Sequence, residues 1–256
     1  MARGPRQLCR SGIYHLMVRG VNRTVIFADD RDRLQYLNIL NRIKEDESVS
    51  VLAFCLMPNH VHLLGKDHNR QISKFMHRLN GSYSHYFNTR HQRVGHLFQN
   101  RYKSEAVEDD AYLATVLRYI HLNPVKAGLS DQPEAYFWSS CKAYYEGADL
   151  LPGLTNTSFI LQLYSDDLQT ARAIIQYATS IDNPDYCWDI DEEKMTDNQA
   201  MKAILLLMQE QCVDRLSNLP RTERNAALRQ IKEIKGLSIR QISRLTGVAF
   251  NIVKRA

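Results

Sequence analysis

The sequence lacks long apolar runs and a recognisable export signal. No apolar run approaches the roughly 18 residues that a membrane-spanning helix requires. The first 20 residues contain several basic side chains, but no continuous apolar segment followed by a small-residue cleavage site. We therefore expect a chain that neither spans a membrane nor carries a signal peptide.

Cysteine is scarce and irregularly spaced. The five cysteines are scattered along the chain, and none forms a CxxC pair. They are Cys9, Cys55, Cys141, Cys187 and Cys212. An odd number without paired spacing argues against both a disulfide framework and a zinc ribbon, and it fits a reducing compartment.

Acidic side chains are too few to balance the basic ones. The chain has 33 Lys and Arg against 28 Asp and Glu, which gives a net charge of +5. This excess favours a polyanionic partner only slightly, because many globular proteins are mildly basic. The length of 256 residues, with 44% hydrophobic and 24% charged side chains, suits one large or two modest globular domains.

The N-terminal half alternates between strand and helix patterns. Alternating or continuously apolar stretches predict four strands, and apolar residues at helical spacing predict two helices. The strands are expected at residues 13–20, 49–57, 60–66 and 100–108, and the helices at 29–47 and 71–91. The order βαββαβ predicts an α+β fold of the ferredoxin-like type, an antiparallel sheet with helices on one face.

A third helix is expected directly after this unit, at residues 111–123. Asp109 or Asp110 can cap its first turn, and Pro124 and Gly128 can stop it. With this helix and the residues after it, a first domain is expected to span residues 1–150.

The composition changes near residue 180. Residues 180–198 are rich in Asp and Glu with a single Lys, which indicates an exposed acidic linker inside a connecting segment of residues 151–195. Thr196 and Gln199 form a capping box ahead of a helix, and a further helix is expected at 222–235. Residues 196–256 are therefore predicted to be an all-α region.

The final stretch, LSIRQISRLTGVAFNIVKRA, has the pattern of a helix-turn-helix. Ser238 and Gln241 form a capping box, and Gly247 permits a tight turn. From Arg215 onward the chain has ten Lys or Arg against two Glu. The candidate DNA contacts are Arg240, Asn251, Lys254 and Arg255. The alternative is a plain helical hairpin inside a helical bundle.

The stretch MPNHVHLL places two histidines in an apolar strand. His60 and His62 are two residues apart and therefore share one face, whereas Val61 points to the opposite layer. Two such imidazoles can bind one divalent metal if a third ligand approaches from another element. The alternative is a pair of ordinary half-buried histidines at a sheet surface.

The helix at 111–123 offers such a third ligand. Tyr119 and Asn123 are four residues apart and share a face. An amide oxygen suits Mg²⁺ or Mn²⁺, and a tyrosine beside the metal is a candidate nucleophile. Alternatively, Asn123 and the following Pro124 only end the helix, and Tyr119 only packs in the core. Tyr112 lies on nearly the same face, so the pattern alone does not choose between the two tyrosines.

Three blocks in this order resemble the REP-associated tyrosine transposases, which are single-tyrosine HUH transposases of bacterial insertion sequences. The blocks are MPNHVHLL, VGHLFQNRYKSEAVEDDAYL (94–113) and RYIHLNPVKAGL (118–129). The resemblance covers roughly residues 8–145. It implies that His60, His62 and Asn123 hold Mg²⁺ or Mn²⁺ and that Tyr119, rather than Tyr112, is the nucleophile.

The resemblance also implies a substrate and a mechanism. The family cleaves and rejoins single-stranded DNA through a 5′-phosphotyrosine, at hairpin-forming repeats, as a monomer or homodimer. The block HLFQNRYK resembles a DNA-contacting segment, which makes candidates of His96, Phe98, Arg101, Tyr102 and Lys103. The expected location is the bacterial cytoplasm, at the nucleoid when DNA is bound.

Two other functions compete with this one. A non-catalytic DNA-binding regulator derived from such a transposase would keep the fold and bind DNA without cutting it. A histidine-triad nucleotide hydrolase also has alternating histidines on a strand, but it needs a third histidine where this chain has Leu64. The histidine-triad alternative is therefore disfavoured.

Overall fold

The computed structural model describes residues 9–180, 197–208, 216, 219–234, 237 and 239–255, with backbone alone at residues 199, 239, 240, 254 and 255. These residues belong to two compact units that divide between residues 188 and 189. Within the described ranges, no helix combines the length and apolar character needed to cross a membrane.

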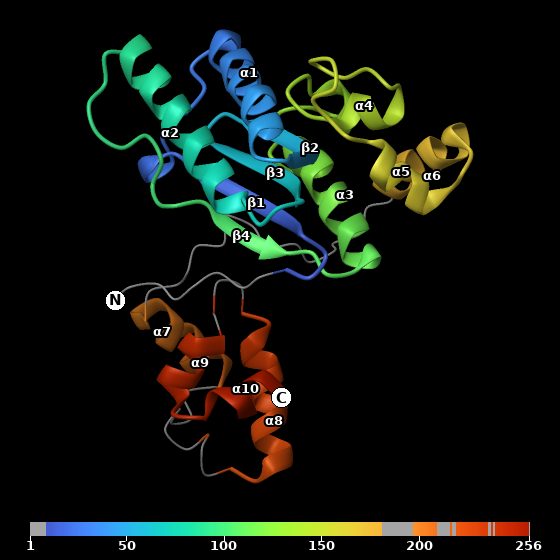
Figure 1. The fold of residues 1–256 in the computed structure, drawn as a ribbon. Helices are drawn as coiled ribbons and strands as arrows, with labels where there is room; N and C mark the ends of the chain where they lie inside the picture. The colour runs from blue at the N-terminus through green and yellow to red at the C-terminus, as the bar shows by residue number, and fades with distance from the viewer. Residues whose placement is uncertain are drawn as a thin grey trace. The chain divides into compact units, whose positions relative to one another are not determined.

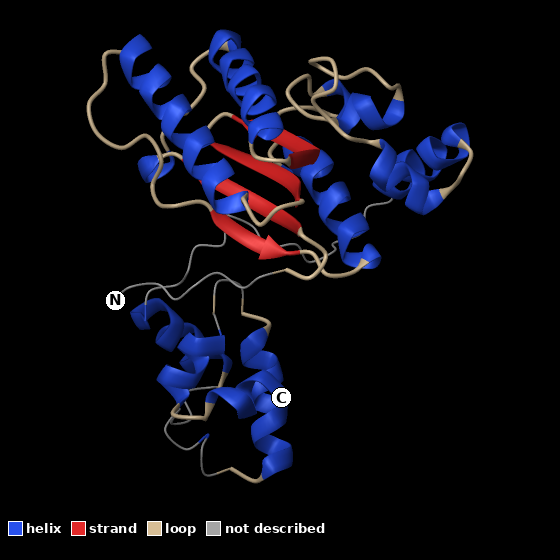
Figure 2. Ribbon diagram, in the orientation of Figure 1, coloured by secondary structure: helices blue, strands red, loops and turns tan. Residues whose placement is uncertain are grey.

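The first unit contains a four-stranded sheet with long helices on both faces (Figures 1 and 2). Its main elements are β1 (Ile13–Arg19), α1 (Asp30–Asp46), β2 (Val49–Met57), β3 (His60–Asp67), α2 (Ile72–Arg90), β4 (Lys103–Ala106) and α3 (Asp110–Lys126). Its shorter helices are η1 (Val21–Arg23), η2 (Pro133–Ala135), α4 (Cys141–Tyr145), α5 (Ser158–Tyr164) and α6 (Leu168–Ser180).

The sheet has the strand order β2-β3-β1-β4, and every neighbouring pair is antiparallel. This is the order that a βαββαβ chain adopts in a ferredoxin-like fold, so the predicted fold class is confirmed. The central pair, β1 and β3, is in continuous register, with Met17 opposite His62 and Arg19 opposite His60. The histidine pair therefore lies on a fully paired inner strand.

Alternation along the strands divides the buried side chains between two cores. Val61 and Leu63 point into the core that α1 and α2 cover, which we call the α1/α2-side core. Leu64 and Cys55 point into the core that α3 covers, which we call the α3-side core. The helices of the βαββαβ unit thus lie on one face, as predicted, and α3 lies on the other.

In the first unit, two elements differ from the prediction by up to three residues, and the other predicted bounds differ by one residue at most. The fourth strand is only Lys103–Ala106, because it pairs with Tyr14–Met17 and no further. The helix expected to stop at Pro124 continues to Lys126, and Gly128 then adopts a positive φ of 66°. At the other end of this helix, the Asp109 carboxylate accepts the Tyr112 backbone N–H at 2.7 Å and supplies the cap.

The segment predicted to connect the two domains packs in part against the first unit. Helices α5 and α6 bury apolar side chains in the α3-side core, among them Ile160, Leu161, Ala171 and Ile175. Residues 158–180 are therefore part of the first unit, and the prediction of a connecting segment from residue 151 was wrong over this range. The acidic stretch at 181–196 lies outside the described residues.

The regular secondary structure described in the second unit is all helical. It comprises α7 (Asp197–Leu207), α8 (Arg221–Lys232), α9 (Ile239–Thr246) and α10 (Phe250–Arg255). Its core residues include Ile204, Leu216, Leu228, Ile231, Ile242, Val248 and Val253. Gly247, with a φ of 68°, lies in the turn between α9 and α10. This short helix pair stands where the helix-turn-helix was predicted.

Candidate active site

The two histidines of β3 lie side by side beneath α3. His60 is 5% exposed and His62 is 0% exposed, and their ring centroids are 5.0 Å apart at an interplanar angle of 84°. Both point to the α3 side of the sheet, because His62 contacts side chains of α3 and shares its face with His60. The pair is therefore buried between a central strand and a helix.

Helix α3 brings Tyr119 and Asn123 onto this histidine face. The Tyr119 ring centroid is 5.4 Å from that of His62, and Asn123 Nδ2 lies 3.4 Å from His62 Nε2. Both side chains are 7% exposed. Tyr112 instead packs at the partly buried rim of the α3-side core, nearly two turns earlier. The contact with His62 thus distinguishes Tyr119 in a way that spacing alone did not.

Hydrogen bonds indicate which nitrogen of each ring carries the lone pair. Asn59 Oδ1 lies 2.6 Å from His60 Nδ1, and an amide oxygen can only accept, so Nδ1 carries the hydrogen. Asn123 Nδ2 is a donor and faces His62 Nε2, so that nitrogen accepts. In the neutral rings both lone pairs then lie on Nε2. Two such nitrogens on one sheet face can ligate a divalent metal.

Burial keeps His62 neutral. Desolvation lowers its pKa well below the ordinary value of 6.5, and the nearby His60, His15 and Arg19 lower it further. Neutral imidazole is the form that binds metals. His62 is therefore in its ligand form at neutral pH.

The donor set fits a hard divalent ion with an amide as third ligand. Over the described ranges, no three His, Cys, Asp or Glu side chains gather in a group that could hold a metal. A site here therefore needs Asn123 beside His60 and His62. A half-turn of the Asn123 amide places Oδ1 where Nδ2 stands, and the set then has two nitrogens and one oxygen, which suits Mn²⁺ or Mg²⁺.

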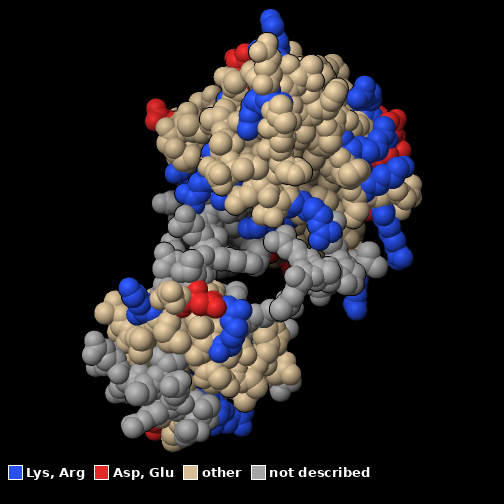
Figure 3. Space-filling view, turned by 90° about the vertical axis from the view of Figure 1, so that its left-hand side faces the viewer, with Lys and Arg blue, Asp and Glu red and all other residues tan. Residues whose placement is uncertain are grey.

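Basic side chains surround this site. Lys126 Nζ lies 5.3 Å from the centroid of the Tyr119 ring. Arg19 is opposite His60 in the sheet register, and Lys103 is opposite Met17, which itself pairs with His62. Figure 3 shows one face of the protein, on which Lys and Arg are more prominent than Asp and Glu over the first unit. The surroundings of the site favour a polyanion.

The predicted DNA-contacting block divides between surface and core. His96 and Arg101 are exposed, and Lys103 is half-buried on β4. Phe98 is half-buried and packs against the α1/α2-side core. Tyr102 is 7% exposed in that same core, and its hydroxyl lies 3.1 Å from Ser73 Oγ. The Tyr102 ring is therefore largely covered by this core, and its contact with DNA stays a prediction.

The same block is nevertheless fastened next to the site. The backbone N–H of Gln99 donates to the Arg19 carbonyl at 2.9 Å, and Val21 N–H donates to the Leu97 carbonyl at 3.0 Å. These bonds hold residues 97–99 against the end of β1, where Arg19 faces His60. The exposed members of the block thus begin close to the histidine face.

In the second unit the structure describes only some of the residues that were predicted to contact DNA. Asn251 is exposed on α10, whereas the side chains of Arg240, Lys254 and Arg255 lie outside the described residues. The Gln241 side chain donates to Asp197 Oδ1 at 3.0 Å, which ties α9 to α7. Ser238, the other half of the predicted capping box, is also outside the described residues.

Sequence reasoning missed His15 and Glu105. His15 is 0% exposed at the centre of β1, and its Nε2 lies 3.0 Å from His62 Nδ1. Glu105 of β4 pairs with His15 in the sheet register. The one available signal was a polar residue at the core-facing positions of the strand pattern IYHLMVR.

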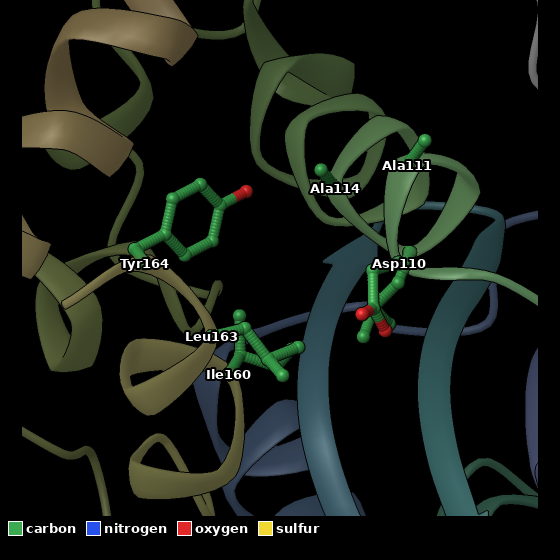
Figure 4. Close-up of a pocket in the computed structure, with 7 residues that line it drawn as sticks. Asp110, Ala111, Ala114, Ile160, Leu163 and Tyr164 are labelled. Atoms are coloured by element: carbon green, nitrogen blue, oxygen red, sulfur yellow. The ribbon is translucent and has the colours of Figure 1, made fainter.

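A separate pocket lies beside the first turns of α3 (Figure 4). It has a volume of about 240 Å³. Its lining is mainly apolar and comprises Asp110, Ala111, Leu113, Ala114, Ile160, Leu163 and Tyr164. None of the candidate catalytic residues is among them, so we assign this pocket no part in the chemistry.

The first half of the chain is similar to known transposases. The family model described as "Transposase IS200 like" matches residues 9–123, which extend from just before β1 to Asn123. A Haemophilus influenzae protein, provisionally named a REP-associated tyrosine transposase, is 26% identical over 159 residues, covering 54% of this chain and 86% of that protein. The chain is therefore similar to the IS200-like and REP-associated tyrosine transposases, as its motifs predicted.

Two solved structures are similar to the chain at a lower level. One is a REP-associated tyrosine transposase bound to a REP hairpin, 18% identical with a TM-score of 0.49, covering 60% of this chain and 90% of that one. The other, provisionally described as a transposase from Deinococcus radiodurans, is 22% identical with a TM-score of 0.34, covering 46% and 95%. The fold assignment therefore rests on the strand order and the helix positions described above.

Proposed function

We propose that this protein cleaves and rejoins single-stranded DNA by transesterification, with Tyr119 as the nucleophile. The proposal depends on the packing of α3 against β3. The ring centroids of Tyr119 and His62 are 5.4 Å apart, and Asn123 Nδ2 lies 3.4 Å from His62 Nε2. The family likeness over residues 9–123 supports a DNA-processing activity. Two lone-pair nitrogens, an amide and a phenol on one face form a metal-assisted phosphoryl-transfer site.

In the proposed reaction the Tyr119 oxygen attacks a backbone phosphate. The new bond joins the tyrosine oxygen to phosphorus, and the bond from phosphorus to the 3′-oxygen breaks. The tyrosine loses its hydroxyl proton, and the 3′-oxygen takes up one proton and leaves as a hydroxyl. A divalent ion held by His60, His62 and Asn123 would polarise the phosphate and offset its negative charge. Because a phosphodiester is retained, a second 3′-hydroxyl can reverse the attack and rejoin strands without ATP.

The proposed substrate is single-stranded or hairpin DNA. Tyr119 is only 7% exposed between a helix and a sheet, which suits an extended single strand better than a duplex. Arg19, Lys103 and Lys126 lie around the site and supply positive charge for the phosphates. We assign His96 and Arg101 to the same strand contacts, and the α9–α10 pair, with exposed Asn251, to a second DNA contact.

The test is formation of a covalent adduct. The full chain is incubated with Mn²⁺ and single-stranded hairpins, and adducts that survive denaturation are counted by gel shift. We expect Tyr119→Phe to abolish the adduct, by at least about a thousandfold since the nucleophile is absent, while hairpin affinity stays within about threefold.

Tyr112→Phe is the matched control, because it removes the other hydroxyl of the same helix, and it should leave the adduct intact. Persistence of the adduct in Tyr119→Phe would overturn the assignment. Hairpin binding by the wild type without any adduct would favour the non-catalytic regulator instead.

A further inference from the structure

His15 lies between an acidic side chain and the candidate metal ligand His62. In the sheet register it is opposite Glu105 of β4 on one side and Leu64 of β3 on the other. Its ring is fully buried and stacks on that of His62, with centroids 5.2 Å apart at 25°. A fully buried imidazole in this position must satisfy its nitrogens through specific neighbours.

One hydrogen bond joins the two rings. His15 Nε2 and His62 Nδ1 are 3.0 Å apart, so one of these nitrogens donates and the other accepts. If His62 ligates a metal through Nε2, its only hydrogen is on Nδ1, and it must be the donor. His15 Nε2 is then the acceptor, and the hydrogen of His15 lies on Nδ1.

Glu105 is placed to favour that arrangement. Its Oε2 lies 3.8 Å from His15 Nδ1. This distance is too long for a direct hydrogen bond, but a carboxylate so near favours a hydrogen on the nitrogen that faces it. The order Glu105, His15, His62 therefore leads to a lone pair on His62 Nε2.

His60 has an equivalent neighbour. Asn59 Oδ1 accepts from His60 Nδ1 at 2.6 Å, so this ring too has its lone pair on Nε2. Outer groups that accept from the second nitrogen of a ligating histidine are the usual means of fixing its tautomer and orientation. His15 would do for His62 what Asn59 does for His60.

We propose that His15, backed by Glu105, is a positioning residue that holds His62 in the tautomer and orientation needed to bind the metal. This inference rests on the proposed function, since it presumes that His62 is a metal ligand. His15 also lies edge-on to the nucleophile, with its ring centroid 5.9 Å from that of Tyr119. The residue therefore packs against both halves of the site from a fully buried position.

The experiment compares His15→Phe and His15→Gln in the full chain. Phenylalanine keeps the flat buried shape but has no acceptor, whereas the Gln Oε1 can accept from His62 Nδ1 in place of Nε2. Mn²⁺ affinity is measured without DNA by electron paramagnetic resonance, and the histidine tautomers of the metal-free protein are read from ¹⁵N chemical shifts. Thermal melts confirm folding of each variant.

We expect His15→Phe to weaken Mn²⁺ binding roughly 10- to 100-fold and His15→Gln to recover most of that loss. In the wild type His62 should show its hydrogen on Nδ1. His121→Phe is the matched control, because His121 is also a fully buried histidine but bonds Ser140 Oγ at 3.0 Å instead of His62. It should leave Mn²⁺ affinity within about threefold of the wild type, well short of the loss expected when an outer-shell partner is removed.

Three outcomes would overturn the inference: a hydrogen on His62 Nε2 in the metal-free wild type, wild-type Mn²⁺ affinity in His15→Phe, or equal losses in both His15 variants. The adduct assay separates this failure from that of the proposed function. If the wild type forms the adduct and His15→Phe binds Mn²⁺ normally, only the role of His15 is contradicted. If the wild type neither binds Mn²⁺ nor forms an adduct, the proposed function is contradicted, and this inference is contradicted with it.

Discussion

At the scale of single residues, Asn123 joins the helix to the histidine face. Its amide lies 3.4 Å from His62 Nε2 and is 7% exposed, so it meets the ring in a nearly dry environment. A neutral amide is a weaker ligand than a carboxylate, because it brings no charge to the metal. The metal affinity of the site should therefore depend strongly on the chemistry of this one side chain.

We predict opposite effects of two nearly isosteric changes at this position. Asn123→Leu removes the third ligand and should lower Mn²⁺ affinity at least about tenfold, whereas Asn123→Asp adds a charged oxygen ligand and should raise it. Isothermal titration of the full chain with Mn²⁺ measures both. Equal affinities in the Leu variant and the wild type would show that Asn123 is not a ligand.

The residues differ in how far the sequence could identify them. Spacing places His60 and His62 on one face and Tyr119 and Asn123 on another, but the choice of Tyr119 over Tyr112 came from the family resemblance. His15 could not be identified, because its partner His62 is 47 positions away and only the sheet register brings the two together. The burial of Tyr102 could not be predicted, because the side of the sheet to which a residue beside a strand points is unknown until that strand is paired.

At the scale of elements, Glu47 joins the end of α1 to α2. Glu47 is 2% exposed and follows the last residue of α1. Its carboxylate pairs with Arg78, and Lys74 Nζ lies 3.1 Å from its Oε2. The hydrogen bond from Arg78 is the main cause that lowers the Glu47 pKa below its ordinary value of 4.5, and Lys74 adds to the effect.

We predict that this link makes stability depend on pH. Because the pKa is lower in the folded chain, the stabilisation is full above the unfolded value of 4.5 and is lost as the pH falls through the folded value. Glu47→Gln should lower the free energy of unfolding at pH 7, and its difference from the wild type should shrink below about pH 4.

Urea unfolding at pH 7, 5 and 3 gives the comparison. Asp46→Asn is the control: Asp46 also pairs with Arg78, but its side chain is 49% exposed, so the loss should be smaller. A difference between Glu47→Gln and the wild type that stays constant over this range would contradict the prediction.

Elements were more predictable than their ends. The strands at 13–19, 49–57 and 60–67 agree closely with the predicted ranges, because their largely apolar runs match strands that are buried on both faces. The fourth strand was overestimated because its length depends on how many residues of β1 remain for it to pair with. Helices α5 and α6 could not be assigned to the first unit, since their apolar faces do not say which core they join.

At the scale of the whole molecule, the described chain has separate cores in its two units. The first unit buries residues such as Leu40 between sheet and helices, and the second buries Leu228 among four helices. The division falls between residues 188 and 189. Units with their own cores unfold independently unless a large interface couples them.

We predict two unfolding transitions in calorimetry of the full chain. Leu40→Ala and Leu228→Ala each remove a fully buried side chain and should cost about 2–5 kcal/mol in the unit that contains it. Each variant should therefore lower one transition and leave the other in place. A single transition that both variants lower would contradict the prediction and indicate one cooperative body.

In the proposed mechanism, the position of Tyr119 and Asn123 on one helix would link movement of the bound strand to metal binding. If Asn123 is a ligand as proposed, the nucleophile and the third ligand move as one piece, while the histidines stay on the central strand β3. Any shift of α3 that carries a covalently held strand away from β3 then also opens the metal's coordination shell. On the proposed mechanism, the site would be complete only while the tyrosine is in place, so a strand held by Tyr119 away from β3 would be protected from premature reversal.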